Sequence, residues 1–151
     1  MKHSLLTLIL SVYPMTSLAT ECIPMSGLYR LSDNQGRVTS LTVNQQDCDR
    51  LYLDYDYNHQ MRFSRTIILD GVNHVVFSSS EVISYESATP TPEGISYRGT
   101  DEYLREKKTY VTEGKIFLDS ALNLIEETAV FDDQGTLLKS STQKYERHQQ
   151  L

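Results

Sequence analysis

Residues 51–57 read Leu51-Tyr52-Leu53-Asp54-Tyr55-Asp56-Tyr57, and this stretch decides the fold class. Leucine or tyrosine stands at every odd position, and the two aspartates fall between them. Successive side chains of a β-strand point to opposite faces, so this alternation is typical of a strand with one buried face and one solvated face. The stretch therefore predicts an antiparallel sheet with its core on one side.

The chain after residue 20 continues in the same manner. Short runs rich in Val, Ile, Thr, Tyr and Phe are separated by turn residues about every 8–12 positions, and no stretch shows a capped helical period. Asp70-Gly71 is expected to form a type I′ hairpin turn, because both residue types tolerate positive φ. The segment 87–94, which holds two prolines, is expected to be an exposed loop. Further turns are expected at 32–36, 47–49, 58–60, 99–101, 113–114 and 132–135.

Roughly nine to eleven short strands with tight connections imply an antiparallel meander. A sheet of that length has to curl or close to hide its edges, so we expect an all-β fold that forms a small β-barrel or a bent half-barrel. A β-sandwich is the alternative, and it is disfavoured because a Greek key needs a long crossover connection.

The N-terminus has the pattern of an export signal. A basic residue, Lys2, precedes the uncharged apolar run 4–13, and small residues lead to a cleavage site after Ala19. The apolar run is shorter than the about 20 residues that a membrane helix needs. We therefore expect a signal peptide at 1–19, a single all-β domain at 20–151 without a membrane span, and a periplasmic or secreted location.

Cys22 and Cys48 are the two cysteines of the chain. Export places them in an oxidising compartment, and neither belongs to a Cys-x-x-Cys motif. We expect them to form a structural disulfide that ties down the mature N-terminus. Such a bridge would contribute roughly 3–4 kcal/mol through the entropy of the unfolded chain.

Charge and motifs exclude several classes of function. Fourteen basic residues against twenty acidic ones give a net charge of -6, which disfavours an electrostatic nucleic-acid binder. The stretch Asp54-x-Asp56-x-Asn58 begins like a calcium loop, but His59 and Arg65 stand where that loop needs Gly and Glu. No zinc-hydrolase, nucleophile-elbow or phosphate-binding motif occurs. We expect no metal, no cofactor and no catalytic residues; an enzyme is disfavoured but not excluded, since a catalytic triad can be dispersed in sequence.

Three short elements resemble the lipocalin and calycin families. Gly27-Leu28-Tyr29 is similar to their Gly-x-Trp motif, with Tyr in place of Trp. Residues 100–103 resemble their Thr-Asp-Tyr turn with Glu102 inserted. Arg147 stands after the last expected strand, where these families place an Arg near the N-terminal aromatic residue. The resemblance implies an antiparallel barrel that holds a small hydrophobic molecule.

Two hypotheses about function follow. The first is an exported barrel that binds a small hydrophobic or lipid-like ligand in its interior. The alternative is an exported structural or protein-interaction module with a filled core, which acts through its surface or through the segment 87–94. The first hypothesis predicts seven inward-facing ligand-binding residues: Leu53, Tyr55, Ile67, Phe77, Ile83, Tyr97 and Leu124.

Overall fold

A computed structural model describes residues 22–32 and 38–148 of the chain. The described residues form ten antiparallel strands and no helix, in agreement with the expected all-β fold. The expected signal peptide at 1–19 and most of the expected turn at 32–36 lie outside the described residues. The strands are β1 (Gly27–Ser32), β2 (Val38–Gln46), β3 (Arg50–Tyr57), β4 (Met61–Ile68), β5 (His74–Ser78), β6 (Val82–Thr91), β7 (Gly94–Tyr103), β8 (Lys108–Leu118), β9 (Leu124–Phe131) and β10 (Leu137–Arg147).

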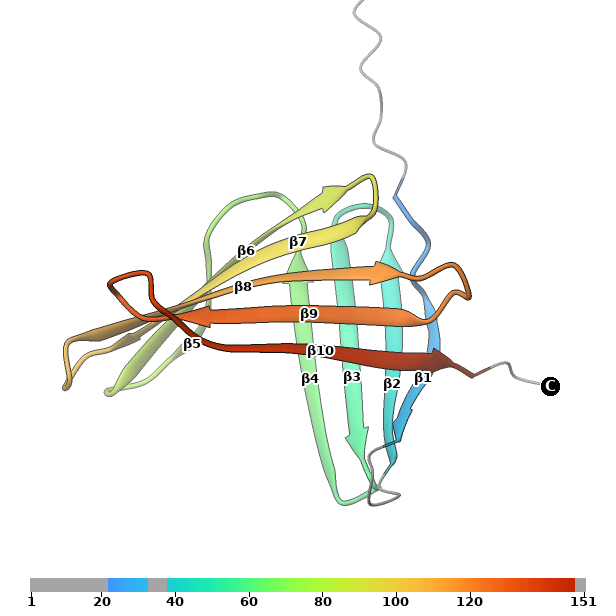
Figure 1. Ribbon diagram of the computed structural model, residues 1–151, viewed down its shortest axis with the longest axis horizontal. Coiled ribbons are helices and arrows are strands. Elements are labelled where there is room, and N and C mark those ends of the chain that lie inside the picture. Colours follow the sequence, from blue (N-terminus) through green and yellow to red (C-terminus); the bar gives the residue numbers. More distant parts are fainter. Residues whose placement is uncertain (1–21, 33–37, 149–151) are drawn as a thin grey trace, which may run out of the picture.

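The strands form one sheet in the order β4-β3-β2-β1-β10-β9-β8-β7-β6-β5. Neighbours in sequence pair with each other, apart from β4 and β5, and the first strand pairs with the last through Tyr29 opposite Arg147. Strands β1–β4 cross strands β6–β10 at a steep angle, so that the sheet curls into a nearly closed barrel (Figure 1). The predicted meander and barrel are confirmed.

The expected hairpin at Asp70-Gly71 is wrong. Strands β4 and β5 stand at opposite ends of the sheet, and the connection between them carries the chain across the gap. Gly71, at φ 73°, donates its N–H to the carbonyl of Ala88 on β6 at 2.8 Å. This bond fastens one end of the gap, which we call the seam, while β4 and β5 stay unpaired with each other along its length.

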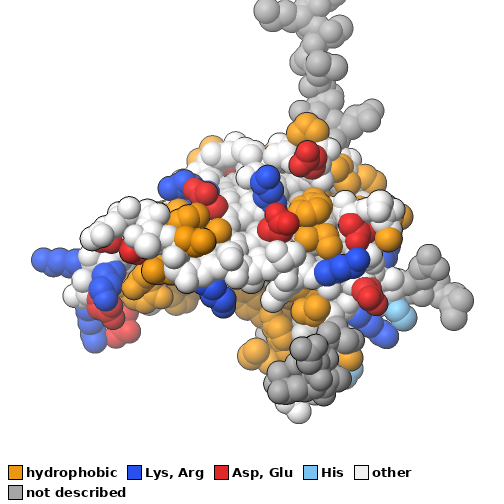
Figure 2. Space-filling view, viewed as in Figure 1, with side chains coloured by type: hydrophobic (Ala, Val, Ile, Leu, Met, Phe, Trp, Pro, Cys, Tyr) orange, Lys and Arg blue, Asp and Glu red, His pale blue; other side chains and the backbone are white. Residues whose placement is uncertain are grey.

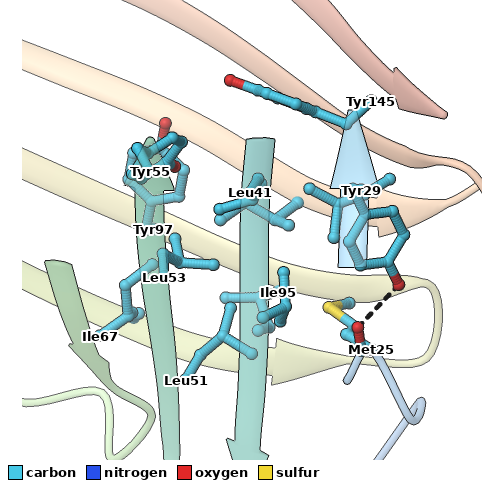
Figure 3. Packing of buried hydrophobic residues seen from close by; sticks show 14 of the residues in the cluster. Met25, Tyr29, Leu41, Leu51, Leu53, Tyr55, Ile67, Ile95, Tyr97 and Tyr145 are labelled. Atoms are coloured by element: carbon cyan, nitrogen blue, oxygen red, sulfur yellow. Dashed lines mark hydrogen bonds between the residues drawn. The ribbon is translucent and has the colours of Figure 1, made fainter. Parts of the chain in front are cut away.

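The core fills the space where the two parts of the sheet cross. Leu51 and Leu53 are buried as the alternation of residues 51–57 predicts, and Tyr29 is fully buried with its hydroxyl donating to the Met25 carbonyl at 2.7 Å (Figure 3). The buried cluster draws side chains from strands β1–β4 and from β6–β10. Contacts between residues distant in sequence thus hold the two parts together.

Two expected turns are wrong because strands run straight through both positions. Strand β7 passes through 99–101 without a reversal, and β8 passes through 113–114. A Cβ at Gly114 would lie 2.2 Å from Cζ of Tyr97, so the close approach of this ring requires a glycine there. The expected loop at 87–94 is also wrong: β6 extends to Thr91, and β7 begins at Gly94.

The N-terminal residues are anchored by a disulfide and by the last strand. Cys22 and Cys48 form the predicted bridge, with a Cα–Cα distance of 5.6 Å. The guanidinium of Arg147, the last residue of β10, lies 6.0 Å from the ring centre of Tyr29 and donates to the Ser26 carbonyl at 3.2 Å.

Acidic and basic side chains are interspersed on the face that β8–β10 present in Figure 2, with uncharged polar surface between them. This face therefore carries no large patch of a single charge sign. Among the described residues, no helix is long and apolar enough to cross a membrane.

Candidate functional site

A groove of about 670 Å³ opens along the seam between β4 on one side and β5, β6 and β7 on the other. Residues from both faces of the edge strand β4 line it. Phe63 and Arg65 lie on the same face of β4 as the buried Ile67, because they alternate along the strand. On β6 and β7, Ser84 and Asp101 are register partners and therefore share one face.

The walls of the groove are apolar and exposed. Phe63 on β4 is 53% exposed, and Phe77 on β5 is 56% exposed. Val75 and Val76 add further exposed apolar surface on β5. Contiguous exposed apolar side chains of this kind mark binding sites in folded proteins more often than isolated ones do.

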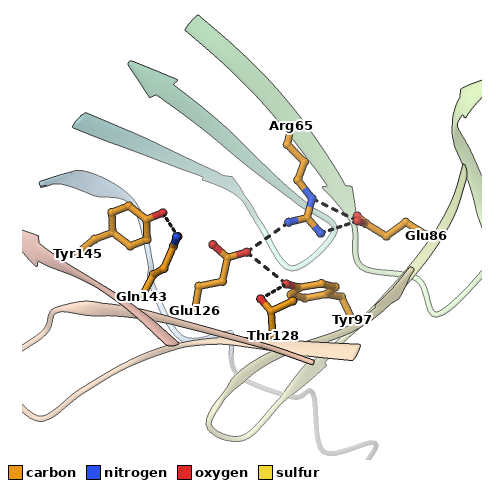
Figure 4. Close-up of polar contacts among 7 residues, drawn as sticks. All are labelled: Arg65, Glu86, Tyr97, Glu126, Thr128, Gln143 and Tyr145. Carbon is orange, nitrogen blue, oxygen red and sulfur yellow. Dashed lines mark hydrogen bonds and ion pairs between the residues drawn. The ribbon is translucent and has the colours of Figure 1, made fainter. Parts of the chain in front are cut away.

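Arg65 and Glu86 form the floor of the groove and belong to a largely buried ionic cluster, shown in Figure 4. Nε of Arg65 donates to Oε2 of Glu86 at 3.2 Å, Nη2 donates to the same oxygen, and Nη1 donates to Oε1 of Glu126 at 3.5 Å. The Tyr97 hydroxyl donates to the same Glu126 oxygen at 3.2 Å and lies 3.2 Å from the Thr128 hydroxyl. These contacts satisfy the buried charges, which would otherwise be costly to remove from water.

The cluster stabilises the charged form of Arg65. Burial by itself would lower the pKa of Arg65, but charge interactions with Glu86, Tyr97 and Glu126 and the hydrogen bonds to Glu86 together raise it above its ordinary value. The guanidinium also lies over the Tyr97 ring, 4.6 Å from its centre. Arg65 is therefore a permanent cation whose charge is already bound by two carboxylates.

An aromatic cluster continues the interior beyond Arg65. The Tyr55 ring lies 6.1 Å from those of Tyr57 and Phe63 and 6.4 Å from that of Tyr145. Burial, followed by the nearby Glu126 charge, raises the pKa of both Tyr55 and Tyr145. Tyr145 donates its hydroxyl to the Gln143 side chain at 2.6 Å. These rings keep their protons at neutral pH and offer both apolar surface and hydroxyl groups.

The structure separates the seven sequence-predicted residues into three groups. Five are buried in the core, and Figure 3 labels four of them. One of the five, Tyr97, also bonds to Glu126 of the ionic cluster. Phe77 lines the groove. Ile83 pairs with Glu102 and thus lies on the face of β6 opposite Ser84. The five core residues are Leu53, Tyr55, Ile67, Tyr97 and Leu124.

Sequence reasoning missed the ionic cluster. Arg65 could have been noticed, because it occupies an inward position between Phe63 and Ile67 in an alternating strand. Its partners Glu86 and Glu126 lie 21 and 61 residues away, on strands whose curvature brings them together. Within the described ranges, no group of three His, Cys, Asp or Glu residues could hold a metal ion.

No protein-family model matches the sequence, and no curated protein matches it either. Among solved structures, the chain is similar to the crystal structure of secretory abundant heat soluble protein 4 from Ramazzottius varieornatus, with a TM-score of 0.49 and 9% sequence identity. The match covers 83% of this chain and 96% of that chain.

Proposed function

We propose that the protein is an exported, lipocalin-like β-barrel protein that binds a small hydrophobic or lipid-like molecule in the seam groove. The observation that carries this proposal is the pair of phenylalanines, Phe63 and Phe77, which line one groove from two strands and are both more than half exposed. A ligand seated between them would remove apolar surface from water that the protein alone leaves exposed. Each such side chain would contribute up to about 2 kcal/mol if it became fully buried.

The size and chemistry of the groove support this proposal. Its volume of about 670 Å³ lies in the range of small-molecule sites, which combine apolar walls with a few polar groups that orient the ligand. Here the walls are Phe63, Val76 and Phe77, and the polar groups are Arg65 and Glu86 on the floor. The seam, rather than the packed centre of the core, is thus the proposed binding space.

Two further observations support export and the lipocalin-like assignment. A disulfide between Cys22 and Cys48 is typical of proteins from oxidising compartments. Arg147 lies against Tyr29, the arrangement that the resemblance to lipocalins implies for these two residues.

Binding of the neutral apolar dye N-phenyl-1-naphthylamine tests the proposal. We expect saturable enhancement of dye fluorescence, and we expect Phe63→Ser and Phe77→Ser to weaken binding about tenfold each. Leu138→Ser is the matched control, because Leu138 is 53% exposed like Phe63 but does not line the groove. Absence of saturable binding, or equal weakening by all three substitutions, would contradict a ligand site at the seam.

A protein-interaction module is the second candidate, and the unpaired edges of β4 and β5 favour it. An exposed strand edge can add an extended peptide through backbone hydrogen bonds. In that case, a bound partner would slow amide hydrogen exchange along β4 or β5, whereas a small apolar ligand would leave the edge amides exchanging as before.

A further inference from the structure

We propose that the seam groove selects amphiphiles with a cationic head group, such as long-chain amines, over those with an anionic head group. This inference rests on the proposed function, because it concerns the head group of the molecule in that groove. It follows from the charges that line the groove and from which of them are already paired.

Each of the three guanidinium nitrogens of Arg65 already donates to a carboxylate. Arg65 bonds to Glu86 through two nitrogens and to Glu126 through a third, and its planar face covers Tyr97. An anionic head group would either approach Arg65 against the negative charges of both carboxylates, or displace one of them and leave it largely buried without its partner. That replacement is costly, since an uncompensated buried charge is strongly unfavourable. The second basic group of the lining, His74, is paired with Asp70 at 3.0 Å.

The carboxylates of the groove, in contrast, can still accept hydrogen bonds from a ligand. Asp101 is half-buried in the groove lining, and within the described part of the chain its side chain has no hydrogen-bond or ion-pair partner. Both bonds that Glu86 accepts from Arg65 end on Oε2, so Oε1 faces no donor among the described residues. Asp101 pairs in register with Ser84, two residues from Glu86, so Asp101 and Glu86 are diagonal neighbours on one face of the sheet.

Aromatic rings flank the free carboxylate. Asp101 is also the register partner of Tyr110 on β8, and the Tyr103 ring packs edge-on against Tyr110 at 5.5 Å between centres. A carboxylate beside aromatic faces is the combination that recognises organic ammonium groups, through charge and cation–π attraction. The nearest basic side chain along β8, Lys108, is paired with Glu106 at 3.5 Å.

Together these features divide the groove into two regions. The apolar walls at Phe63, Val76 and Phe77 accept a hydrocarbon chain, and the surface at Asp101 and Glu86 accepts an ammonium group. The ligand class is therefore a single-chain organic cation with a terminal ammonium.

Displacement of N-phenyl-1-naphthylamine from the oxidised full-length mature protein by three ligands of equal chain length tests this inference. The ligands are dodecylammonium, dodecanoate and 1-dodecanol, each kept below its aggregation concentration. We expect dodecylammonium to bind at least tenfold more tightly than dodecanoate, with dodecanol between them. Raising the salt concentration from 50 to 500 mM should weaken only the binding of dodecylammonium.

Asp101→Asn is expected to weaken dodecylammonium binding five- to tenfold and to leave dodecanol binding unchanged. Glu102→Gln is the matched control: it removes one negative charge from the adjacent, half-buried position, whose side chain lies on the opposite face of β7. Equal or tighter binding of dodecanoate in the unsubstituted protein would overturn the head-group inference, as would equal effects of the two substitutions. In both cases, binding of dodecanol would still support a ligand site at the seam. Failure of the dye and of all three ligands to bind would overturn the proposed function.

Discussion

The Tyr97 ring on β7 occupies the space that any side chain at position 114 on β8 would need. An ideal Cβ at Gly114 would lie 2.2 Å from Cζ and 2.4 Å from Oη of Tyr97. The ring must lie there because its hydroxyl reaches Glu126 and Thr128, and its face supports the Arg65 guanidinium. The absence of a side chain at Gly114 thus leaves room for the Tyr97 ring, which supports the polar floor of the groove.

Gly114→Ala is expected to destabilise the protein by about 2 kcal/mol, because overpacking forces the Tyr97 ring away from its partners. Gly99→Ala is the matched control on the neighbouring strand. A Cβ at Gly99 would meet its nearest neighbour, Cβ of Thr112, at 3.6 Å, which is ordinary contact, so stability should stay the same or rise slightly. Urea denaturation of both variants measures the difference; equal losses from the two substitutions would contradict the packing role of Gly114.

Removal of the Arg65 side chain should be far more costly than removal of an exposed arginine. Arg65→Ala leaves Glu86 and Glu126 as uncompensated, largely buried charges, and we expect a loss of about 3 kcal/mol. Arg98→Ala is the control, because Arg98 bonds to Glu113 at 2.6 Å with both side chains more than half exposed, and it should cost under about 1 kcal/mol. Similar denaturation midpoints for the two variants would show that the Arg65 cluster does not stabilise the fold.

Alkaline pH should unfold the protein through its buried tyrosines. Burial raises the pKa of Tyr29, Tyr55, Tyr97 and Tyr145 above the ordinary value of 10.0. The unfolded chain loses these protons near pH 10 while the folded chain keeps them, so their contribution to stability is complete below pH 10 and declines as the pH rises above it. Absorbance at 295 nm should therefore rise in two steps, the second coinciding with unfolding. A single step near pH 10 in a protein that stays folded would refute this assignment.

Loss of the disulfide should lower the free energy of unfolding by about 3 kcal/mol. The bridge joins residues separated by 26 positions, and a loop of this size restricts the unfolded chain by roughly that amount. The double variant Cys22→Ser/Cys48→Ser reports the loss by urea denaturation. A reductant should lower the stability of the parent protein to that of the double variant and leave the double variant unchanged; equal stability of the oxidised parent and the double variant would contradict the prediction.

Several features could be predicted because they depend on local patterns. The alternation of residues 51–57 correctly placed Leu51, Leu53 and Tyr55 inside. Gly99 and Gly114 were misinterpreted as turn residues, although both lie within strands. At Gly114, a glycine required for close packing has the same appearance in sequence as one required for positive φ. Only the neighbours across the sheet distinguish the two cases.

The sequence by itself determined the antiparallel meander and the tendency to form a barrel, because period-two patterning and short connections act over a few residues. The disulfide followed from the presence of two cysteines in a chain with the pattern of an export signal. The tertiary structure decided where the barrel fails to close and what lines the opening. Pairing of β1 with β10 leaves β4 and β5 as the two ends, and the curl of the sheet brings Arg65, Glu86 and Glu126 together from three strands. Such a cluster depends on how far each strand twists and tilts, a property of the whole sheet that no local stretch of sequence encodes.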